Sequence, residues 1–429
     1  MADPPAIHRQ PLSESSLLPG IAGVDLLAAN EGKPSALVHQ AKSEPECVFP
    51  SSPRPRRRPV RFLFGVFSSF VRFCFSLASL VALLAVLTAI PGLQLIAFGY
   101  LLGVAGRLAN GGTIRESLPQ FRQAGQIGLA VLAVFVAALP TQLLVHWESV
   151  AYLIDPGSEQ AMAMRVLAIA SSVLATGYLL WAWVRGGRLK HYLWPEPKRF
   201  FREGWRWRNY RTAPDRLWEF TNSLRLAHYF WLGARGALGT LIWLIPALVI
   251  IVAFREGESG LAGLVGFLSL VCLGLGIMYL PMLQAHYAAE NRLKALFEVR
   301  QIRRCFRRAP WAWLVAMFIS LVLTPVPLYL LKIEVTQQEV MWLPCLLFVA
   351  FILPARISTG LALRRARRRP EPEGRWAMIS RWVVRLNMLM VVAIYLLFVY
   401  VSQYTSWDGL ATWVQQHAIL VPVPFFSGV

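Results

Sequence analysis

Long apolar segments alternate with short loops rich in arginine and lysine along most of this chain, and this alternation strongly constrains its fold. An α-helix needs about 20 predominantly apolar residues to cross a bilayer, where each backbone polar group must be hydrogen-bonded within the protein. With 56% hydrophobic residues, the chain is far more apolar than a soluble domain. The sequence therefore predicts an all-α protein, a polytopic transmembrane helix bundle. Its nine apolar segments lie at about residues 73–91, 93–106, 124–145, 166–184, 229–254, 260–284, 311–331, 341–363 and 382–402.

The first part of the apolar region permits two arrangements. Residues 93–106 are too few for a comfortable crossing, and Gly99 and Gly103 have the small-xxx-small spacing of closely packed helices. Residues 62–106 therefore either cross the membrane twice or form a re-entrant hairpin. The first arrangement gives nine crossings and the second gives seven.

The distribution of basic residues predicts the orientation in the membrane. Of the 43 Lys and Arg residues, 34 lie in alternate loops, whereas the intervening loops hold one each. Cytoplasmic loops carry the excess of positive charge in membrane proteins. We therefore expect the N-terminus in the cytoplasm and the C-terminus outside, for seven crossings as for nine.

Three regions follow from this pattern. Residues 1–58 are rich in Pro, Ser and charge without a sustained period, and we expect a disordered cytoplasmic arm. Residues 59–405 form the transmembrane domain, with interfacial basic loops at 185–228 and 285–310. Residues 406–429 form a short extracytoplasmic tail.

The two interfacial loops favour contact with anionic lipid. In loop 185–228, arginines alternate with aromatic side chains, a pattern that is typical of interfacial helices and, less often, of proteins that stack nucleic-acid bases. Because apolar segments flank both loops, we expect anionic membrane lipids as partners and no nucleic acid. The expected contacts are Arg199, Arg202, Arg206, Arg208, Arg300, Arg303, Arg304, Arg307 and Arg308.

A group of polar residues marks the end of the sixth long apolar segment and is a candidate polar site. The spacing of His286 and Glu290 places them on one helix face, where the carboxylate could hold the imidazolium charged. Gln94 and Tyr100, from a similar Pro-containing segment, could join them. The alternative is a structural hydrogen-bond cluster at the membrane interface. The candidate residues are Gln284, His286, Tyr287, Glu290 and Asn291.

Three arginines lie within or beside apolar segments. Arg235 and Arg356 are each seven residues from an end of their segment, so the sequence favours side chains that extend to the membrane surface. Arg72 is expected at headgroup depth.

The sequence contains no P-loop, no nucleophile elbow, no HExxH and no paired carboxylates within an apolar segment. The five cysteines are scattered and suit neither a zinc site nor a disulfide framework. We therefore expect no catalytic residues, no cofactor, no metal and no enzymatic activity. The favoured function is a non-enzymatic lipid-interacting or scaffold component of the cell membrane. The alternative is a transporter or channel with a polar site near residues 284–291.

Two stretches resemble a known family. They are IPGLQLIAFGYLLGVAGRLANGGTIRESLPQF (residues 90–121) and HYAAENRLKALFEVRQIRRCFRRAPWAWLVAM (residues 286–317). They are similar to a bacterial family of multi-pass membrane proteins that is known only as a domain of unknown function. The resemblance implies a location in the bacterial inner (cytoplasmic) membrane, and it implies no activity.

Overall fold

The computed structural model describes residues 59–186, 191–192, 194, 196, 198–199, 202, 211, 213–255, 260–325, 342–405, 417 and 419–422. All of them belong to one unit that begins at Pro59. The predicted arm at residues 1–58 lies outside the described residues.

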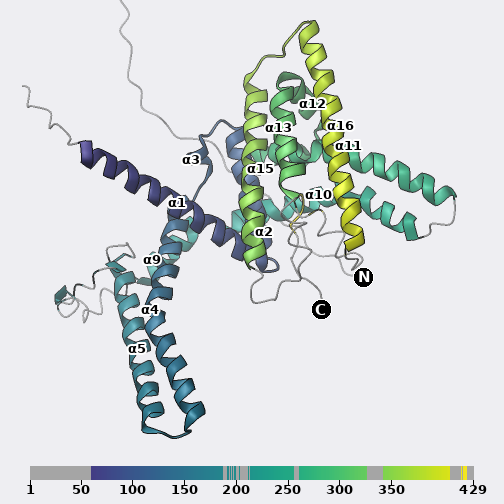
Figure 1. Ribbon diagram of the computed structural model, residues 1–429. Coiled ribbons are helices and arrows are strands. Elements are labelled where there is room, and N and C mark those ends of the chain that lie inside the picture. Colours follow the sequence, from purple (N-terminus) through teal and green to yellow (C-terminus); the bar gives the residue numbers. More distant parts are fainter. Residues whose placement is uncertain are drawn as a thin grey trace, which may run out of the picture. The chain divides into compact units, whose positions relative to one another are not determined.

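The described part of the chain is helical and contains no strand, which confirms the all-α fold (Figure 1). Its elements are α1 (Pro59–Ala89), α2 (Gln94–Ala109), α3 (Ile114–Ser117), α4 (Phe121–Ile154), α5 (Glu159–Val184), α9 (Ala213–Ser223), α10 (Leu226–Arg255), α11 (Gly260–Glu290), η1 (Leu293–Phe297), α12 (Val299–Arg308), α13 (Pro310–Phe318), η2 (Ile319–Leu323), α15 (Trp342–Arg368) and α16 (Arg375–Thr405).

Among the described residues, six helices are long and apolar enough to cross a membrane. A seventh span is possible where two helices, Val299–Arg308 and Pro310–Leu323, meet at an angle of 110°. The bend falls at Pro310, whose ring removes a backbone donor and begins a new helix. The predicted number of nine is therefore approximate. The six helices are Val66–Ala89, Phe121–Ile154, Glu159–Val184, Gly263–Glu290, Pro344–Arg368 and Arg375–Val399.

The short helix α2 lies at the centre of the bundle. Its 16 residues extend about 24 Å, less than the roughly 30 Å of the hydrocarbon core, so α2 does not form the second predicted crossing alone. It contacts α1, α10, α11 and α15, and 13 of its residues are buried. Because other helices surround α2, a large polar side chain there would be buried, and its buried residues include few of them.

Glycines allow the neighbouring helices to approach α2 closely. A Cβ on Gly99 would lie 1.9 Å from the Tyr229 carbonyl oxygen of α10, and one on Gly233 would lie 1.9 Å from the Leu95 carbonyl oxygen. On the α15 side, a Cβ on Gly360 would lie 2.6 Å from the carbonyl oxygen of Ala105. The helix backbones are therefore in contact at these glycines, which have no Cβ. The small-xxx-small spacing of Gly99 and Gly103 predicts such close packing.

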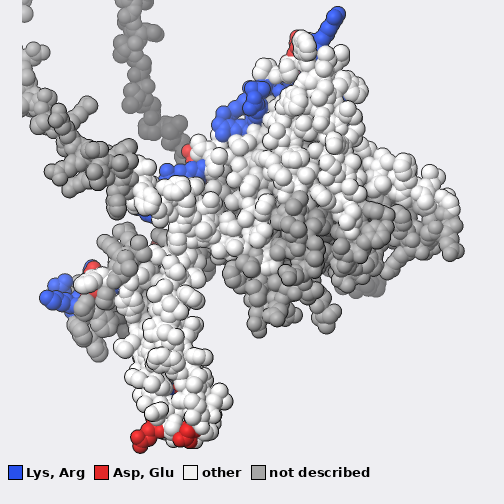
Figure 2. All heavy atoms as spheres, viewed as in Figure 1, with Lys and Arg blue, Asp and Glu red and all other residues white. Residues whose placement is uncertain are grey.

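Helices α4 and α5 form an antiparallel pair, and large apolar side chains such as Phe135, Leu153 and Leu174 are exposed along them (Figure 1). Exposed apolar surface of this extent suits contact with lipid. Figure 2 shows acidic side chains at the turn between these two helices. It also shows basic side chains over the end of the bundle where α15 ends and α16 begins.

Candidate functional site

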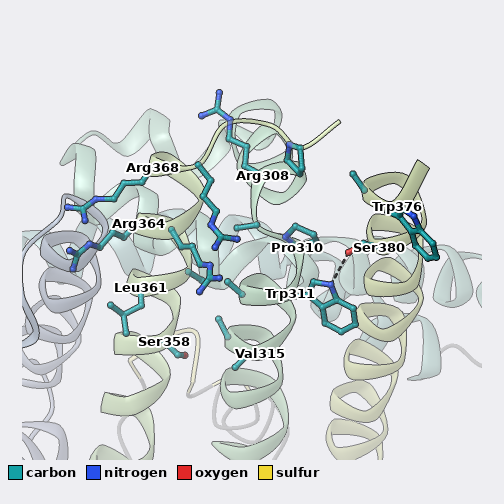
Figure 3. Close-up of a pocket in the computed structure, with 18 of the residues that line it drawn as sticks. Arg308, Pro310, Trp311, Val315, Ser358, Leu361, Arg364, Arg368, Trp376 and Ser380 are labelled. Atoms are coloured by element: carbon teal, nitrogen blue, oxygen red, sulfur yellow. Dashed lines mark hydrogen bonds between the residues drawn. The ribbon is translucent and has the colours of Figure 1, made fainter. Parts of the chain in front are cut away.

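A groove lies at the basic end of the bundle, between α13, the last turns of α15 and the first turns of α16 (Figure 3). Its volume is about 1190 Å³. Apolar side chains line its floor, and arginines line its rim. The groove is therefore apolar toward the middle of the helices and strongly basic toward their ends.

Helical spacing at the end of α15 places three of these arginines on one face, and Arg369, which directly follows α15 and whose N–H bonds to the Arg365 carbonyl, continues it. Residues one helical turn apart lie above one another, so Arg364 and Arg368 form one row and Arg365 and Arg369 form the next. Arg308, the last residue of α12, completes the rim from the opposite side. Between α15 and α16 the chain reverses at Gly374, whose φ of 101° is readily adopted by glycine.

In Figure 3, Arg364 and Arg368 extend away from Trp311, and Nη1 of Arg364 donates to the carbonyl oxygen of Gly112 at 3.1 Å. The charge of the rim otherwise has few partners among the described residues. One acidic residue, Glu373, lines the groove, and none of the five arginines forms an ion pair with a described carboxylate. The Nε of Arg308 is buried without a hydrogen-bond partner in the part of the chain that the structure describes. By contrast, Arg307 and Arg381, just outside the groove, each lie 3.4 Å from the carboxylate of Glu371. The groove is thus suited to an anion.

The floor and walls of the groove are apolar and aromatic. Val315 of α13 and Leu361 of α15 lie below the arginines in Figure 3. The indole of Trp311 donates a hydrogen bond of 2.8 Å to Ser380, which joins α13 to α16 across the groove. Trp376 stands at the edge with 84% of its surface exposed. Tryptophan is typical of the boundary between hydrocarbon and headgroups.

Among the predicted lipid contacts, Arg308 lines this groove. The other arginines of that set in α12 (Arg300, Arg303, Arg304 and Arg307) are exposed, while Ile302, Cys305 and Phe306 on the opposite face are buried. Of the contacts expected in loop 185–228, Arg199 and Arg202 are exposed, and Arg206 and Arg208 lie outside the described residues.

Sequence reasoning did not single out the groove arginines Arg364, Arg365 and Arg368 of α15 or Arg369, which follows it. Their signal was present in the sequence: the segment 364–385, one of the alternate segments rich in positive charge, holds eight basic residues. These arginines are one helical turn apart and directly follow an apolar segment, which indicates a basic face on the end of the same helix.

The predicted polar cluster divides into two groups, and the first is formed by the buried His286 and the partly exposed Glu290. Nη2 of Arg367 donates to Nδ1 of His286 at 2.9 Å and to the Glu290 carboxylate at 3.0 Å. Because a guanidinium only donates, the proton of His286 is on Nε2, which lies 2.9 Å from the carboxylate of Glu298. The expected direct pairing of His286 with Glu290 is therefore wrong: Arg367 bridges the two residues.

The hydrogen bond from His286 lowers the pKa of Glu298, and the charges of Arg292 and Lys294 act in the same direction. Nη1 of Arg367 also donates to the side-chain oxygen of Asn110 at 2.7 Å. This cluster connects the ends of α2, α11 and α15 through charged hydrogen bonds.

Gln284 and Tyr287 point into the bundle and are fully buried. The Tyr287 hydroxyl donates to the carbonyl of Leu232 at 3.0 Å. Asn291 is exposed, has a left-handed φ of 52° and ends α11, where its N–H bonds to the Tyr287 carbonyl. The Tyr100 hydroxyl donates instead to the carbonyl of Pro119. The five predicted residues therefore do not share one cavity.

Arg356 is the partner of Gln284 that the sequence did not predict. It lies within α15 and is only 3% exposed, so the expected extension to the membrane surface is wrong for this residue. Nη1 donates to the Gln284 side-chain oxygen at 2.5 Å, and the guanidinium lies 5.4 Å from the ring centre of Phe98. Arg235 and Arg72 are exposed.

The apolar helices define this chain as a membrane-embedded, all-α protein. Residues 203–333 match the model of a family described as a protein of unknown function, DUF4013. The match includes the second of the two resembling stretches, residues 286–317, and from the groove it includes only the residues of α12 and α13. No curated protein and no solved structure matches the chain. Within the described residues, no group of three or more His, Cys, Asp and Glu could hold a metal ion.

Proposed function

We propose that this protein is a non-enzymatic membrane component that binds anionic phospholipids in the groove between α13, α15 and α16. The observation that carries the proposal is the rim of five arginines above an apolar floor, none of which forms an ion pair with a carboxylate in the described part of the chain. The phosphate of a lipid headgroup would lie among the arginines, and an acyl chain would follow Val315 and Leu361 toward the middle of the helices.

Three physical arguments support a phospholipid as the occupant. Guanidinium groups bind phosphate oxygens through paired, charge-assisted hydrogen bonds. Each basic residue near an anionic leaflet contributes about 1 kcal/mol to association with it. The floor is apolar and continuous with the helix surface. A soluble phosphate has no apolar group that could cover this floor, whereas a phospholipid has its acyl chains.

The same charge distribution supports an orientation. We infer that the basic end of the bundle faces the cytoplasm and that the acidic turn between α4 and α5 faces the outside. This orientation agrees with a cytoplasmic N-terminus and an external C-terminus in a bacterial inner membrane.

The test is a double substitution, Arg365→Gln with Arg369→Gln. Both side chains line the groove and are exposed, so their loss should leave the bundle folded. Native mass spectrometry of the detergent-solubilised protein would measure retained phosphatidylglycerol against phosphatidylcholine. The unchanged protein should retain the anionic lipid preferentially. The double variant should bind it about thirtyfold more weakly, from about 1 kcal/mol per arginine.

The matched control is Arg115→Gln with Arg122→Gln, which removes the same charge from exposed residues of α3 and α4 that do not line the groove. This variant should keep its preference for the anionic lipid. Equal losses in both variants would show a general effect of charge and would contradict binding in the groove. Equal retention of the two lipids by the unchanged protein would contradict it as well.

A second candidate function is a transporter or channel with a polar site near residues 284–291. The observation that favours it is the burial of Gln284 with Arg356 inside the bundle. A polar pair at this depth is typical of sites that bind a ligand within the membrane.

A further inference from the structure

Residues near the C-terminus reach into the helix bundle and are held there by Gln284 and Arg356. We call residues 417 and 419–422 the C-terminal segment. Nη2 of Arg356 donates to the carbonyl oxygen of Ile419 at 2.8 Å, and Nε2 of Gln284 donates to that of Leu420 at 2.7 Å. Two adjacent backbone oxygens therefore converge on one guanidinium–amide pair.

The positive charge of Arg356 has only neutral partners among the described residues. They are the Gln284 amide oxygen, the Ile419 carbonyl oxygen and the face of the Phe98 ring. Its Nε is buried and has no hydrogen-bond partner in the described part of the chain. A buried charge is costly unless a counter-charge and hydrogen bonds compensate it. The environment of Arg356 would therefore favour an anion.

The remainder of the C-terminal segment is apolar and buried. Ile419, Leu420 and Val421 are 3%, 1% and 4% exposed, and they belong to the same core as the leucines of α11. His417 is also buried, and its Nδ1 lies 2.9 Å from the hydroxyl of Tyr395 in α16. The segment thus presents two oxygens to the guanidinium and apolar side chains to the helices.

We propose that Arg356 and Gln284 form a binding site for the carboxylate of an acid with an apolar chain, such as a fatty acid, and that the C-terminal segment competes for this site. The two carboxylate oxygens would replace the carbonyl oxygens of Ile419 and Leu420. A carboxylate would also bring the guanidinium a counter-charge, which the two neutral carbonyls do not supply. The apolar chain would take the space of the segment's side chains. This site is separate from the groove, and the proposal does not depend on phospholipid binding there.

The first test measures hydrogen exchange of the full chain in phosphatidylcholine nanodiscs, with decanoate as the probe and decanol as the uncharged control. Decanoate should increase the exchange of the peptide that contains the C-terminal segment, because it displaces the two carbonyls and frees the segment. Decanol should leave that exchange unchanged. Equal effects of both compounds, or no effect of decanoate, would overturn the proposal.

The second test weakens the competitor with Ile419→Ala and Leu420→Ala. Binding of radiolabelled decanoate to nanodiscs, with empty nanodiscs subtracted, should become at least about tenfold tighter, because two buried side chains no longer hold the segment in place. Leu261→Ala with Leu264→Ala is the matched control, since both leucines are exposed on α11, and it should leave decanoate binding unchanged.

Arg356→Gln should abolish decanoate binding. If that variant does not fold, the alanine pair still decides the question. Two outcomes would show that the C-terminal segment does not compete for the site. In one, the Ile419→Ala and Leu420→Ala variant binds decanoate no more tightly than the unchanged protein. In the other, the control variant binds it more tightly by the same factor.

Discussion

Arginines that look alike in the sequence have three different environments in this protein. Arg356 is buried and held by neutral oxygens, Arg367 bridges His286 and Glu290, and Arg365 and Arg369 are exposed on the rim of the groove. An arginine with a carboxylate partner contributes mainly to local structure. An arginine without a carboxylate partner can bind the anionic group of a ligand. The absence of such a partner among the described residues therefore indicates a candidate binding site.

At the residue scale, Glu298→Gln should change the pH dependence of stability. Because the folded state lowers the pKa of Glu298, its carboxylate stabilises the protein above the ordinary glutamate value of about 4.5. This contribution is lost as the pH falls below that value through the lower pKa of the folded state. Thermal unfolding in detergent between pH 3 and 7 should therefore show the variant less stable near neutral pH, by at most about 1 kcal/mol for a partly exposed carboxylate.

The difference between the two proteins should shrink toward the acidic end of that range. Glu219→Gln, at an exposed glutamate of α9, is the control and should show no such convergence. A difference that persists unchanged to pH 3 would mean that the carboxylate charge of Glu298 is not what stabilises this cluster.

At the scale of the element, α2 depends on glycines in its neighbours as well as on its own apolar sequence. Its 16 residues would form a marginal helix in isolation, and packing on four other helices supplies most of its stability. The contacts of Gly99 and Gly233 let α2 and α10 meet backbone to backbone.

Gly233→Ala should therefore destabilise the bundle. The added Cβ would lie 1.9 Å from the carbonyl oxygen of Leu95, and overpacking of this kind typically costs about 1–3 kcal/mol. The thermal midpoint in detergent measures the effect. Gly263→Ala is the matched control, because nothing lies within 4 Å of its Cβ position and alanine favours a helix by up to about 1 kcal/mol. Equal midpoints for the two variants would contradict a close contact between α2 and α10.

At the scale of the whole molecule, opposite charges mark different turns of the described chain. Asp155 and Glu159 flank the turn between α4 and α5, whereas arginines crowd the turn between α15 and α16. Positive charge on cytoplasmic turns is what orients a membrane protein during insertion.

A reporter enzyme that is active only outside the cytoplasm tests this orientation. Inserted at Gly157, between α4 and α5, it should be active, and inserted at Gly374, between α15 and α16, it should be silent. A second reporter that is active only inside should give the opposite pair. If both reporters show Gly374 outside and Gly157 inside, the orientation inferred from the loop charges is reversed.

Several features of the candidate sites could be read from residues close together in the sequence. The amphipathic face of α12 follows from the spacing of Ile302, Cys305 and Phe306, and the arginine rows at the end of α15 follow from one-turn spacing. The meeting of Gln284 with Arg356 and Leu420 could not be read in this way. These residues lie far apart in the chain and belong to α11, α15 and the C-terminal segment.

The sequence by itself determined that this protein is a set of apolar helices with basic ends, because hydrocarbon forces each spanning backbone to satisfy its own hydrogen bonds. Tertiary structure decided which polar side chains became partners. Arg356 was expected at the membrane surface, yet Gln284 and the C-terminal segment offer it oxygens inside the bundle. The reason is that hydrophobicity acts along each segment separately, whereas a buried charge is stabilised only by groups that packing brings to it from elsewhere.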